Sequence, residues 1–319
     1  MNQNQTLIEV KSLCKYFPVS RSMLLKAVDG VSFKVQKSKV LGLVGESGCG
    51  KTTIGRVLLN LLHPTSGEVI FDDVNLQALS KPEMRKMRRR MQIVFQDPYA
   101  SLNPRMTIGS ILTFPMKVQG LFKENLQERA ISLLEKVGMR ASDMNRYPHE
   151  FSGGQLQRIG IARTLAVDPE FIVADEPVSA LDVSIQSQVL NLFKELQEEF
   201  HLTCLFIAHD LSVVEFISNY IAVLYLGKIV ELAPSEVLYK SHQHPYTKSL
   251  LSAIPMPDPK VQKSKPPFSL TGETTSPINP PPGCRFYSRC QVKMPKCKEN
   301  APQLVEIEKA HYVSCFLMD

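Results

Sequence analysis

The amino-acid sequence predicts an α/β protein with a parallel sheet, an antiparallel β subdomain, an inserted helical subdomain and a C-terminal extension rich in proline and cysteine. The parallel sheet is indicated by short segments that are continuously apolar, as strands buried on both faces are: residues 40–44, 171–174 and 204–208. The antiparallel subdomain is indicated by segments in which apolar and polar residues alternate: residues 7–13, 28–35 and 68–71.

Helices are expected after two of the apolar segments, over residues 52–62 and 183–200. Between Gln96 and Asp168 the pattern is helical, most clearly in residues 126–137, and no convincing strand is found. We therefore expect one domain over residues 1–234, with a helical subdomain at about residues 97–168.

The composition changes after residue 234. Of the 22 prolines, 11 lie between Pro255 and Pro302, which disfavours regular structure and favours an extended, wrapping tail. Residues 235–319 are therefore expected to form a separate C-terminal extension.

Charge and hydropathy limit the class of protein. The 37 basic and 31 acidic residues give a net charge of +6, which is mild for a nucleic-acid binder but suits anionic ligands or a lipid surface. No stretch approaches the roughly 18 apolar residues of a membrane-spanning helix. The first five residues lack the basic and apolar regions of a secretory signal, so we expect a cytosolic protein.

Residues 45–52 match the P-loop pattern, Gly-x-x-x-x-Gly-Lys-Thr, between an expected strand and an expected helix. In such a loop the backbone N–H groups surround a β-phosphate, Lys51 adds positive charge near the β and γ oxygens, and the Thr52 hydroxyl ligates Mg²⁺. The core is therefore expected to be that of a P-loop NTPase. The predicted phosphate-binding residues are Gly45, Glu46, Ser47, Gly48, Cys49, Gly50, Lys51, Thr52 and Thr53.

Two carboxylates, Asp175 and Glu176, end the apolar strand at residues 171–174, at the sheet edge where nucleotide sites form. Asp175 can hold the metal, directly or through water, and Glu176 is placed to polarise an attacking water. Gln96 and His209 also follow short apolar strands. By themselves these two residues are ambiguous, because a lone histidine at a strand end is more often structural than catalytic.

Ser152 and Gln155 form a capping-box pattern that opens a helix with one apolar face, and Gly153 and Gly154 lie between them. Because these glycines have no Cβ, a backbone or a ligand can approach closely. A helix N-terminus with unpaired N–H groups binds anions. In isolation the tetrapeptide is better explained as an ordinary capped helix, and only the neighbouring motifs favour a ligand-binding role.

Taken in order, these motifs resemble those of the nucleotide-binding subunit of an ATP-binding cassette (ABC) transporter over roughly residues 7–233. The resemblance rests on the P-loop, Gln96, residues 151–155, Asp175–Glu176, residues 179–182 and His209. Phe151 stands where the family more usually has leucine, a conservative apolar change.

The resemblance implies further roles. Gln96 would sense the γ-phosphate and ligate Mg²⁺ together with Thr52 and Asp175, and His209 would contact the γ-phosphate. Asp182 would lie in a loop that signals across a dimer, and Tyr16 or Phe17 would stack on adenine. The ATP held by one P-loop would be closed over by residues Ser152, Gly153, Gly154 and Gln155 of another subunit, with Glu176, His209, Gln96 and Lys51 as the catalytic group.

Residues 95–105, residues 244–251 and the cysteine tail are similar to the oligopeptide and dipeptide importer branch of this family. The resemblance implies an ATPase that drives peptide uptake from the cytoplasmic face of the inner membrane, as a peripheral subunit. Its partners would be a second ATPase, expected to be a paralogue, two membrane-spanning permease subunits and an external substrate-binding protein. The same branch also imports nickel or glutathione, which stay open as substrates.

The tail cysteines are Cys284, Cys290, Cys297 and Cys315. Their spacing lacks the close pairs usual for structural zinc. Four thiolates are enough for a [4Fe–4S] cluster, and some proteins of the branch carry one there. A cluster, a zinc site and free thiols all stay open.

Two other classes of function are less consistent with the sequence. A soluble ABC ATPase that acts on nucleic acid usually fuses two cassettes or has long insertions, and this sequence has neither, so no nucleic-acid partner is expected. A nucleotide-binding regulator without turnover is disfavoured by the presence of both Glu176 and His209.

Overall fold

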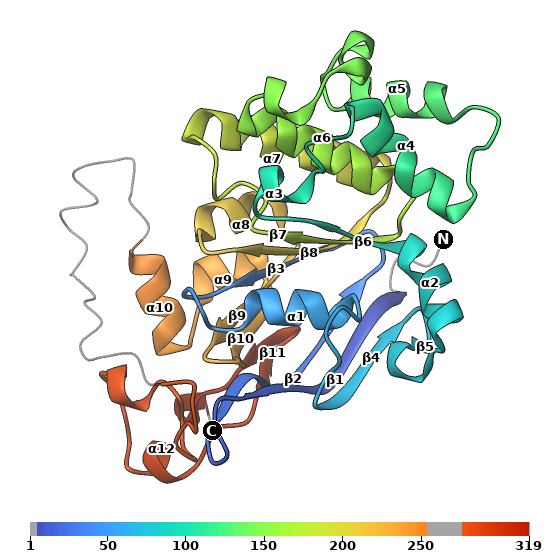
Figure 1. Ribbon diagram of the computed structural model, residues 1–319. Helices are drawn as coiled ribbons and strands as arrows, with labels where there is room; N and C mark the ends of the chain where they lie inside the picture. The colour runs from blue at the N-terminus through green and yellow to red at the C-terminus, as the bar shows by residue number, and fades with distance from the viewer. Residues whose placement is uncertain (1–4, 254–275, 319) are drawn as a thin grey trace, which may run out of the picture. The chain divides into compact units, whose positions relative to one another are not determined.

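The computed structural model describes residues 5–253 and 276–318, and the chain divides into two compact units (Figure 1). Unit 1 comprises Met1–Leu7, Val35–Lys39 and Ala78–Ile207, and unit 2 comprises Ile8–Lys34, Val40–Gln77 and Ala208–Asp319. In the part of the chain that the structure describes, no helix is long and apolar enough to cross a membrane.

Unit 1 contains three parallel strands, β6 (Met91–Val94), β7 (Phe171–Asp175) and β8 (Thr203–Ala208). The central strand β7 pairs with both neighbours, and Val173 lies opposite Ile93 on one side and Leu205 on the other. Every residue of β7 and β8 is buried. The predicted parallel, fully buried strands are therefore confirmed here.

The helices of unit 1 lie mainly between β6 and β8 in the sequence. They are α2 (Lys81–Arg90), α3 (Pro98–Ser101), α4 (Ile108–Gln119), α5 (Leu126–Lys136), α6 (Gly153–Leu165) and α7 (Val183–Glu199), with the short 3-10 helices η2 (Ala141–Asn145) and η3 (Pro148–Glu150). Helices α4, α5 and α6 pack against one another around Leu112, Leu133 and Ile159, which are fully buried (Figure 1). No strand occurs between residues 96 and 168, all of which are described, as the periodicity predicted.

Unit 2 holds the antiparallel subdomain. Its strand order is β2-β1-β4-β5, formed by β2 (Leu24–Gln36), β1 (Thr6–Pro18), β4 (Ser66–Phe71) and β5 (Val74–Asn75). Strand β1 runs antiparallel to β4, with Val10 opposite Val69. The alternation of apolar and polar residues predicted half-buried antiparallel strands correctly, because one face of the sheet is buried and the other is more exposed.

The second sheet region of unit 2 is mixed, not parallel as the sequence suggested. Strand β3 (Val40–Val44) pairs in parallel with β9 (Tyr220–Tyr225), but β9, β10 (Lys228–Pro234), β12 (His311–Val313) and β11 (Val305–Glu308) pair antiparallel in that order. The chain reverses direction between β9 and β10 at Leu226 and Gly227, which have φ of 44° and 78°. Two successive residues with positive φ are typical of the tight hairpin turn that joins antiparallel strands.

Within the described residues, the helices of unit 2 are short. They are α1 (Lys51–Leu58), α8 (Leu211–Ile217), α9 (Ser235–Ser241), α10 (Pro245–Ser252) and α12 (Lys296–Glu299), with η1 (Leu76–Ala78), η4 (Tyr287–Arg289) and η5 (Phe316–Met318). Helix α1 ends four residues before the predicted Leu62, because Asn60 takes a left-handed conformation with φ of 50°.

The C-terminal extension is more ordered than its composition suggested. Residues 254–275, which hold part of the proline-rich stretch, lie outside the described residues. Beyond Pro302 the chain forms β11 and β12, and β12 joins β10. The buried side chain of His311 meets the buried Glu231 of β10, with Nε2 2.8 Å from Oε1, so a polar contact as well as a strand pairing attaches the extension.

Candidate functional site

The P-loop lies in unit 2 between the end of β3 and the start of α1. Lys51 is 5% exposed, and its ammonium donates hydrogen bonds to the backbone oxygens of Gly45 at 2.8 Å and of Glu46 at 3.0 Å. Ser47 and Gly48 are exposed at the tip of the loop, and Thr52 and Thr53 are half-buried in the first turn of the helix. The loop therefore places a buried positive charge beside a glycine-rich, solvent-open tip.

Two glycines let neighbouring backbone approach this loop. A Cβ on Gly45 would lie 2.2 Å from the carbonyl oxygen of Leu224, and one on Gly50 would lie 2.1 Å from that of Ala27. Gly50 also has φ of 110°, which disfavours any other residue. Gly48 has φ of 76°, but nothing lies within 4 Å of its Cβ position, so the space there is open to a ligand.

Cys49 is buried beneath the loop, and burial raises the pKa of its thiol. It is therefore a protonated, packed side chain at neutral pH.

Tyr16 and Phe17, the candidates for stacking on adenine, end strand β1 and are half-buried. The Tyr16 hydroxyl donates a hydrogen bond to Oδ1 of Asp29, and its backbone N–H donates to Oγ1 of Thr65 at 2.9 Å. Each ring has a lysine ammonium nearby, Lys26 at 5.4 Å from the Tyr16 centroid and Lys15 at 5.0 Å from that of Phe17. The choice between the two rings stays a prediction.

In unit 1 the structure brings Gln96 and Glu176 together at the ends of β6 and β7. The Gln96 amide donates to Oε2 of Glu176 at 3.0 Å and lies 3.3 Å from Oγ of Ser179. Glu176 has φ of 48°, a left-handed conformation that costs energy for a residue with a side chain, and its N–H donates to Ile207 O at 3.0 Å. Asp175, one residue earlier, is 6% exposed.

The other two predicted residues occupy exposed positions. Asp182 is the residue before α7, and its side chain makes no capping hydrogen bond to the helix. His209 follows β8 directly and belongs to unit 2.

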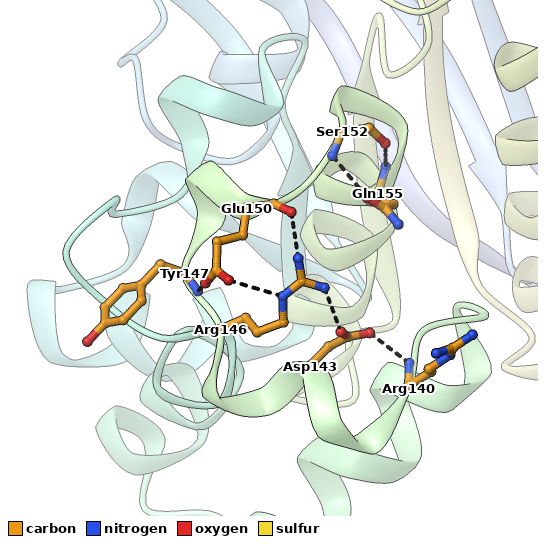
Figure 2. A network of polar contacts seen from close by, with 7 residues as sticks. All are labelled: Arg140, Asp143, Arg146, Tyr147, Glu150, Ser152 and Gln155. Carbon is orange, nitrogen blue, oxygen red and sulfur yellow. Dashed lines mark hydrogen bonds and ion pairs between the residues drawn. The ribbon is translucent and has the colours of Figure 1, made fainter.

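Residues 152–155 begin α6 with the predicted capping box. The Ser152 N–H donates to Oε1 of Gln155 at 2.9 Å, and the Gln155 N–H donates to Oγ of Ser152 at 3.4 Å (Figure 2). A Cβ on Gly153 would make only ordinary contacts, the nearest at 3.5 Å from Leu181, whereas one on Gly154 would lie 2.4 Å from Ile185. Gly154 is thus required for packing, and Gly153 is free to serve a ligand.

A polar network holds the chain that leads into this helix (Figure 2). Arg146 binds Asp143 Oδ1 at 3.0 Å and the backbone oxygen of Glu150 at 2.7 Å, and its guanidinium lies 4.3 Å from the ring centroid of Phe151. The Glu150 carboxylate accepts from the N–H of Tyr147 at 2.6 Å. This backbone hydrogen bond, with the help of Arg146, lowers the pKa of Glu150. The network fixes Phe151, and therefore the start of the capped helix.

Sequence reasoning missed three residues that contact the P-loop region from the C-terminal part of the chain. The Tyr246 hydroxyl accepts from the N–H of Glu46 at 3.0 Å, Arg289 Nη1 lies 2.9 Å from both carboxylate oxygens of Glu46, and Arg285 binds Asp29. The available signal was their place within the His244-Pro-Tyr segment or near the tail cysteines, because no pattern of residue types links positions 200 or more apart.

The four tail cysteines line one small cavity of about 20 Å³, together with His244 and Phe286. A cavity of that size holds about one water molecule. Burial, followed by the neighbouring thiols, raises the pKa of Cys284 to about 11, and burial also raises the pKa of Cys290. Within residues 5–253 and 276–318, no three His, Cys, Asp or Glu side chains are grouped so as to hold a metal ion. The four cysteines therefore line a common cavity, but within the described residues they do not form a group of metal ligands.

Comparison with family models gives two matches. Residues 28–179 match the model described as ABC transporter, and residues 230–297 match the one described as the C-terminal region of oligopeptide/dipeptide transporters.

Several full-length proteins are similar to this chain. It is 53% identical to the oligopeptide transport ATP-binding protein named YkfD of Bacillus subtilis, over 98% of this chain and 95% of that protein. It is 49% identical to the oligopeptide transport ATP-binding protein AppF of the same organism, over 98% of each chain. A peptide import ATP-binding protein of Brucella ovis is 54% identical over 97% of each chain.

Solved structures agree with these similarities. The ATP-binding cassette MJ0796, in a dimeric post-hydrolysis state bound to ADP and Pi, has a TM-score of 0.65 and 29% identity, over 72% of this chain and 99% of that one. CbiO1 of Clostridium perfringens, part of the transporter complex cbiONQ, has a TM-score of 0.66 and 25% identity, over 75% of this chain and 92% of that one.

Proposed function

This chain belongs to the ABC transporter family as an ATP-binding subunit of a peptide importer, in which ATP hydrolysis is coupled to transport, and we propose the following roles for its residues in binding and hydrolysing ATP. Lys51 and the P-loop hold the β- and γ-phosphates, Glu176 orients the attacking water, and Gln96 and His209 contact the γ-phosphate. Residues 152–155 close over ATP that is bound to the P-loop of a second ATPase subunit.

The observation that carries this proposal is the contact between Gln96 and Glu176. An amide donor 3.0 Å from Oε2 holds the carboxylate in one orientation at the end of a rigid, buried strand. Such prior orientation of a group that activates water is what hydrolysis of a phosphoanhydride requires, because most of the catalysis comes from positioning and electrostatics.

The phosphate-binding residues fit a nucleotide. The Lys51 ammonium is buried against the loop's own carbonyls, and the tip at Gly48 is open. As phosphate oxygens arrive, they can replace the carbonyls as partners of the ammonium, and charge that develops on the transferred phosphoryl is stabilised by the same group.

Mg²⁺ fits the predicted donors, which are the hydroxyl of Thr52, the carboxylate of Asp175 and the amide oxygen of Gln96. These are hard oxygen ligands, and Mg²⁺ usually takes one or two protein carboxylates together with waters and phosphates. When bound, the ion neutralises charge on the phosphate oxygens. We propose these three residues as its protein ligands.

The glycines at the start of α6 support an ATP site that is shared between two ATPase subunits. Gly153 has room for a close approach and makes no packing contact that requires glycine. The similar cassette MJ0796 is described as dimeric in a post-hydrolysis state with ADP and Pi. We propose that Ser152, Gly153 and the helix N-terminus bind the γ-phosphate of the partner's ATP, and that Asp182 reports its presence across the dimer.

The chain is a component of a peptide transporter complex. We propose that its partners are a paralogous ATPase, two permease subunits and an external substrate-binding protein, at the cytoplasmic face of the inner membrane. Residues 1–234 would form the ATPase domain, with the helical subdomain at about 97–168 facing the permeases, and residues 235–319 the importer-type extension. The proposal predicts that the full-length chain sediments with membranes only when the permease subunits are present.

We propose oligopeptides or dipeptides as the cargo, with nickel and glutathione as the alternatives within the branch. A deletion strain supplied with labelled di- and oligopeptides, nickel or glutathione separates these cargoes. Loss of peptide uptake that the parent gene restores and Glu176→Gln does not restore is the expected result. Unchanged peptide uptake, with loss of nickel or glutathione uptake, would replace peptide as the cargo.

A [4Fe–4S] cluster stays a prediction for the tail cysteines. The four residues surround one cavity, which favours it, but the cavity has room for about one water and the thiols are not arranged as ligands. Iron and sulfide analysis of anaerobically purified protein, beside the Cys290→Ser variant, decides the question, because a cluster predicts both elements in the parent and neither in the variant.

A further inference from the structure

The C-terminal extension contacts the P-loop through Arg289, the last residue of η4. Its Nη1 lies 2.9 Å from both Oε1 and Oε2 of Glu46, the second residue of the loop. The Arg289 side chain is 8% exposed and that of Glu46 is 30% exposed. Charge-assisted hydrogen bonds are stronger when solvent is largely excluded, so this contact restrains the loop more than a surface ion pair would.

The backbone of the same loop residue is held by a second group. The N–H of Glu46 donates to the hydroxyl of Tyr246, which is fully buried in α10. The Tyr246 ring packs against Tyr225 at 4.6 Å and against Phe286 at 5.5 Å between centroids. Glu46 is therefore fixed at both its side chain and its backbone by residues beyond position 240.

Arg285 supports the loop indirectly, through the turn between β9 and β10. It donates to the backbone oxygen of Leu226 and to the carboxylate of Asp29. Leu226 and Gly227 form the turn between β9 and β10, and the Gly227 N–H donates to the oxygen of Cys49 in the P-loop at 2.8 Å. The Gly227 oxygen in turn accepts from the N–H of Asp29 at 2.8 Å.

These contacts form one connected support for the phosphate-binding loop. Arg285, Phe286 and Arg289 are close in the sequence. Arg285 contacts the turn at Leu226, the Phe286 ring packs against Tyr225, and Arg289 contacts the loop at Glu46. The extension thus touches the phosphate loop at Glu46 and touches the turn that holds the loop at Cys49.

We propose that the extension is a positioning element of the nucleotide site, in which Arg289 and Tyr246 set the conformation of the P-loop through Glu46 and so determine the affinity for ATP. The inference rests on the proposed function only in that it assumes ATP at this loop. Arg289 and Tyr246 touch no phosphate themselves. Their effect is on binding, because the loop must be held in the shape that its N–H groups present to phosphate.

The test uses the full-length chain and its complete transporter. Arg289→Ala is expected to raise the Kd for a non-hydrolysable ATP analogue with Mg²⁺, and the KM for ATP, by about tenfold, the usual effect of losing a charged hydrogen bond. The kcat at saturating ATP should stay near the parent value, because Gln96 and Glu176 are untouched. Arg289→Lys, which keeps the charge, should recover part of the affinity.

Lys298→Ala is the matched control, since it removes one positive charge from an exposed position of the same extension. It should leave Kd and KM unchanged. Glu46→Ala should weaken binding by a similar factor to Arg289→Ala, and the double variant should be no worse than either, because both remove the same contact.

Tyr246→Phe keeps the inference testable if Arg289→Ala fails to fold, since it removes a single oxygen and should also raise Kd. A Kd for Arg289→Ala or Tyr246→Phe within twofold of the parent, with both variants folded, overturns the inference. A parent protein that neither binds nor hydrolyses ATP would instead overturn the proposed function.

Discussion

The amide of Gln96 donates a hydrogen bond of 3.0 Å to Oε2 of Glu176, linking the ends of the neighbouring parallel strands β6 and β7. Ser179 completes the arrangement, because its hydroxyl donates to the backbone oxygen of Glu176 at 3.0 Å and lies 3.3 Å from the Gln96 amide. Glu176 is held in a left-handed conformation by these contacts. A strained residue retained at the end of a buried strand is typical of a functional site.

Glu176→Gln tests the role of this carboxylate. The amide keeps the size of the side chain and an oxygen for Gln96, so ATP binding and folding should be retained, while ATP turnover should fall by roughly a hundredfold or more because the base is lost. Phosphate release by the transporter and the thermal stabilisation by ATP measure the two effects. Glu170→Gln, at an exposed ion pair with Arg90, is the control and should retain turnover. Parental turnover in Glu176→Gln would assign the base elsewhere.

The two glycines of the capped helix should differ sharply when each is replaced by alanine. Gly153→Ala should fold normally, since its Cβ meets nothing closer than 3.5 Å, yet reduce ATP hydrolysis at least tenfold by crowding the partner's γ-phosphate. Gly154→Ala should lower the free energy of unfolding by about 1–3 kcal/mol, because its Cβ would lie 2.4 Å from Ile185.

Thermal unfolding and single-subunit ATP binding separate the two glycine variants. Gly153→Ala should bind ATP at its own P-loop as the parent does. If it hydrolysed ATP in the transporter at the parental rate, the shared site would have no support from this glycine.

Within the P-loop, Gly50→Ala should be far more damaging than Gly48→Ala. Both positions have positive φ, which costs about 1–2 kcal/mol for alanine, but only Gly50 would also place a Cβ 2.1 Å from a backbone oxygen. Calorimetric titration with ATP should show binding lost for Gly50→Ala and weakened for Gly48→Ala. Equal affinities for the two variants would mean that the contact with Ala27 does not determine the loop conformation.

Acid should destabilise unit 2 through His244. Burial lowers its pKa from 6.5 to about 3, and its Nδ1 accepts from the N–H of Tyr246 at 3.1 Å, so the folded protein holds it neutral. Between pH 6.5 and 3 the unfolded chain binds one proton more than the folded one. The contribution of His244 to the free energy of unfolding is therefore complete above pH 6.5. Below that pH the free energy of unfolding decreases by up to about 1.4 kcal/mol per pH unit because of this residue.

His244→Asn keeps an acceptor at the start of α10 but removes the titrating ring, so it should reduce this slope. Urea unfolding at pH 5 and pH 8 measures the difference between the two free energies. His201→Asn, at an exposed position with φ of 50° that asparagine tolerates, should leave the slope unchanged. An identical slope in the parent and His244→Asn would show that another group causes the acid sensitivity.

Much of the fold could be predicted because its signals are local. The buried strands β3, β7 and β8 are continuous apolar runs, and the P-loop and the capping box of Ser152 are contiguous patterns. The sheet type could not be predicted fully, since the antiparallel pairing of β9 with β10 depends on a turn at Leu226 and Gly227 that carries no strong sequence signature. The strands β11 and β12 were not predicted, because the proline-rich stretch before them indicated only an extended tail.

The candidate site also contains features that could be predicted from local motifs and contacts that could not. Lys51, Glu176 and Ser152 follow from motifs, because their chemistry requires particular residue types at fixed spacing. The contact between Gln96 and Glu176 spans 80 positions, and the one between Arg289 and Glu46 spans 243. An ordinary arginine in a tail gives no indication of its partner.

By itself, the sequence determined the class of protein, the P-loop pattern at residues 45–52 and the helix that begins at Ser152, since each depends on hydrogen bonds and steric demands within a few neighbouring residues. Only the tertiary structure decided which way the strands after β9 run, that Gly154 serves packing while Gly153 is free, and that Arg289 and Tyr246 hold the P-loop. Those features depend on which distant side chains become neighbours when the core excludes water, and no short pattern of residues records that.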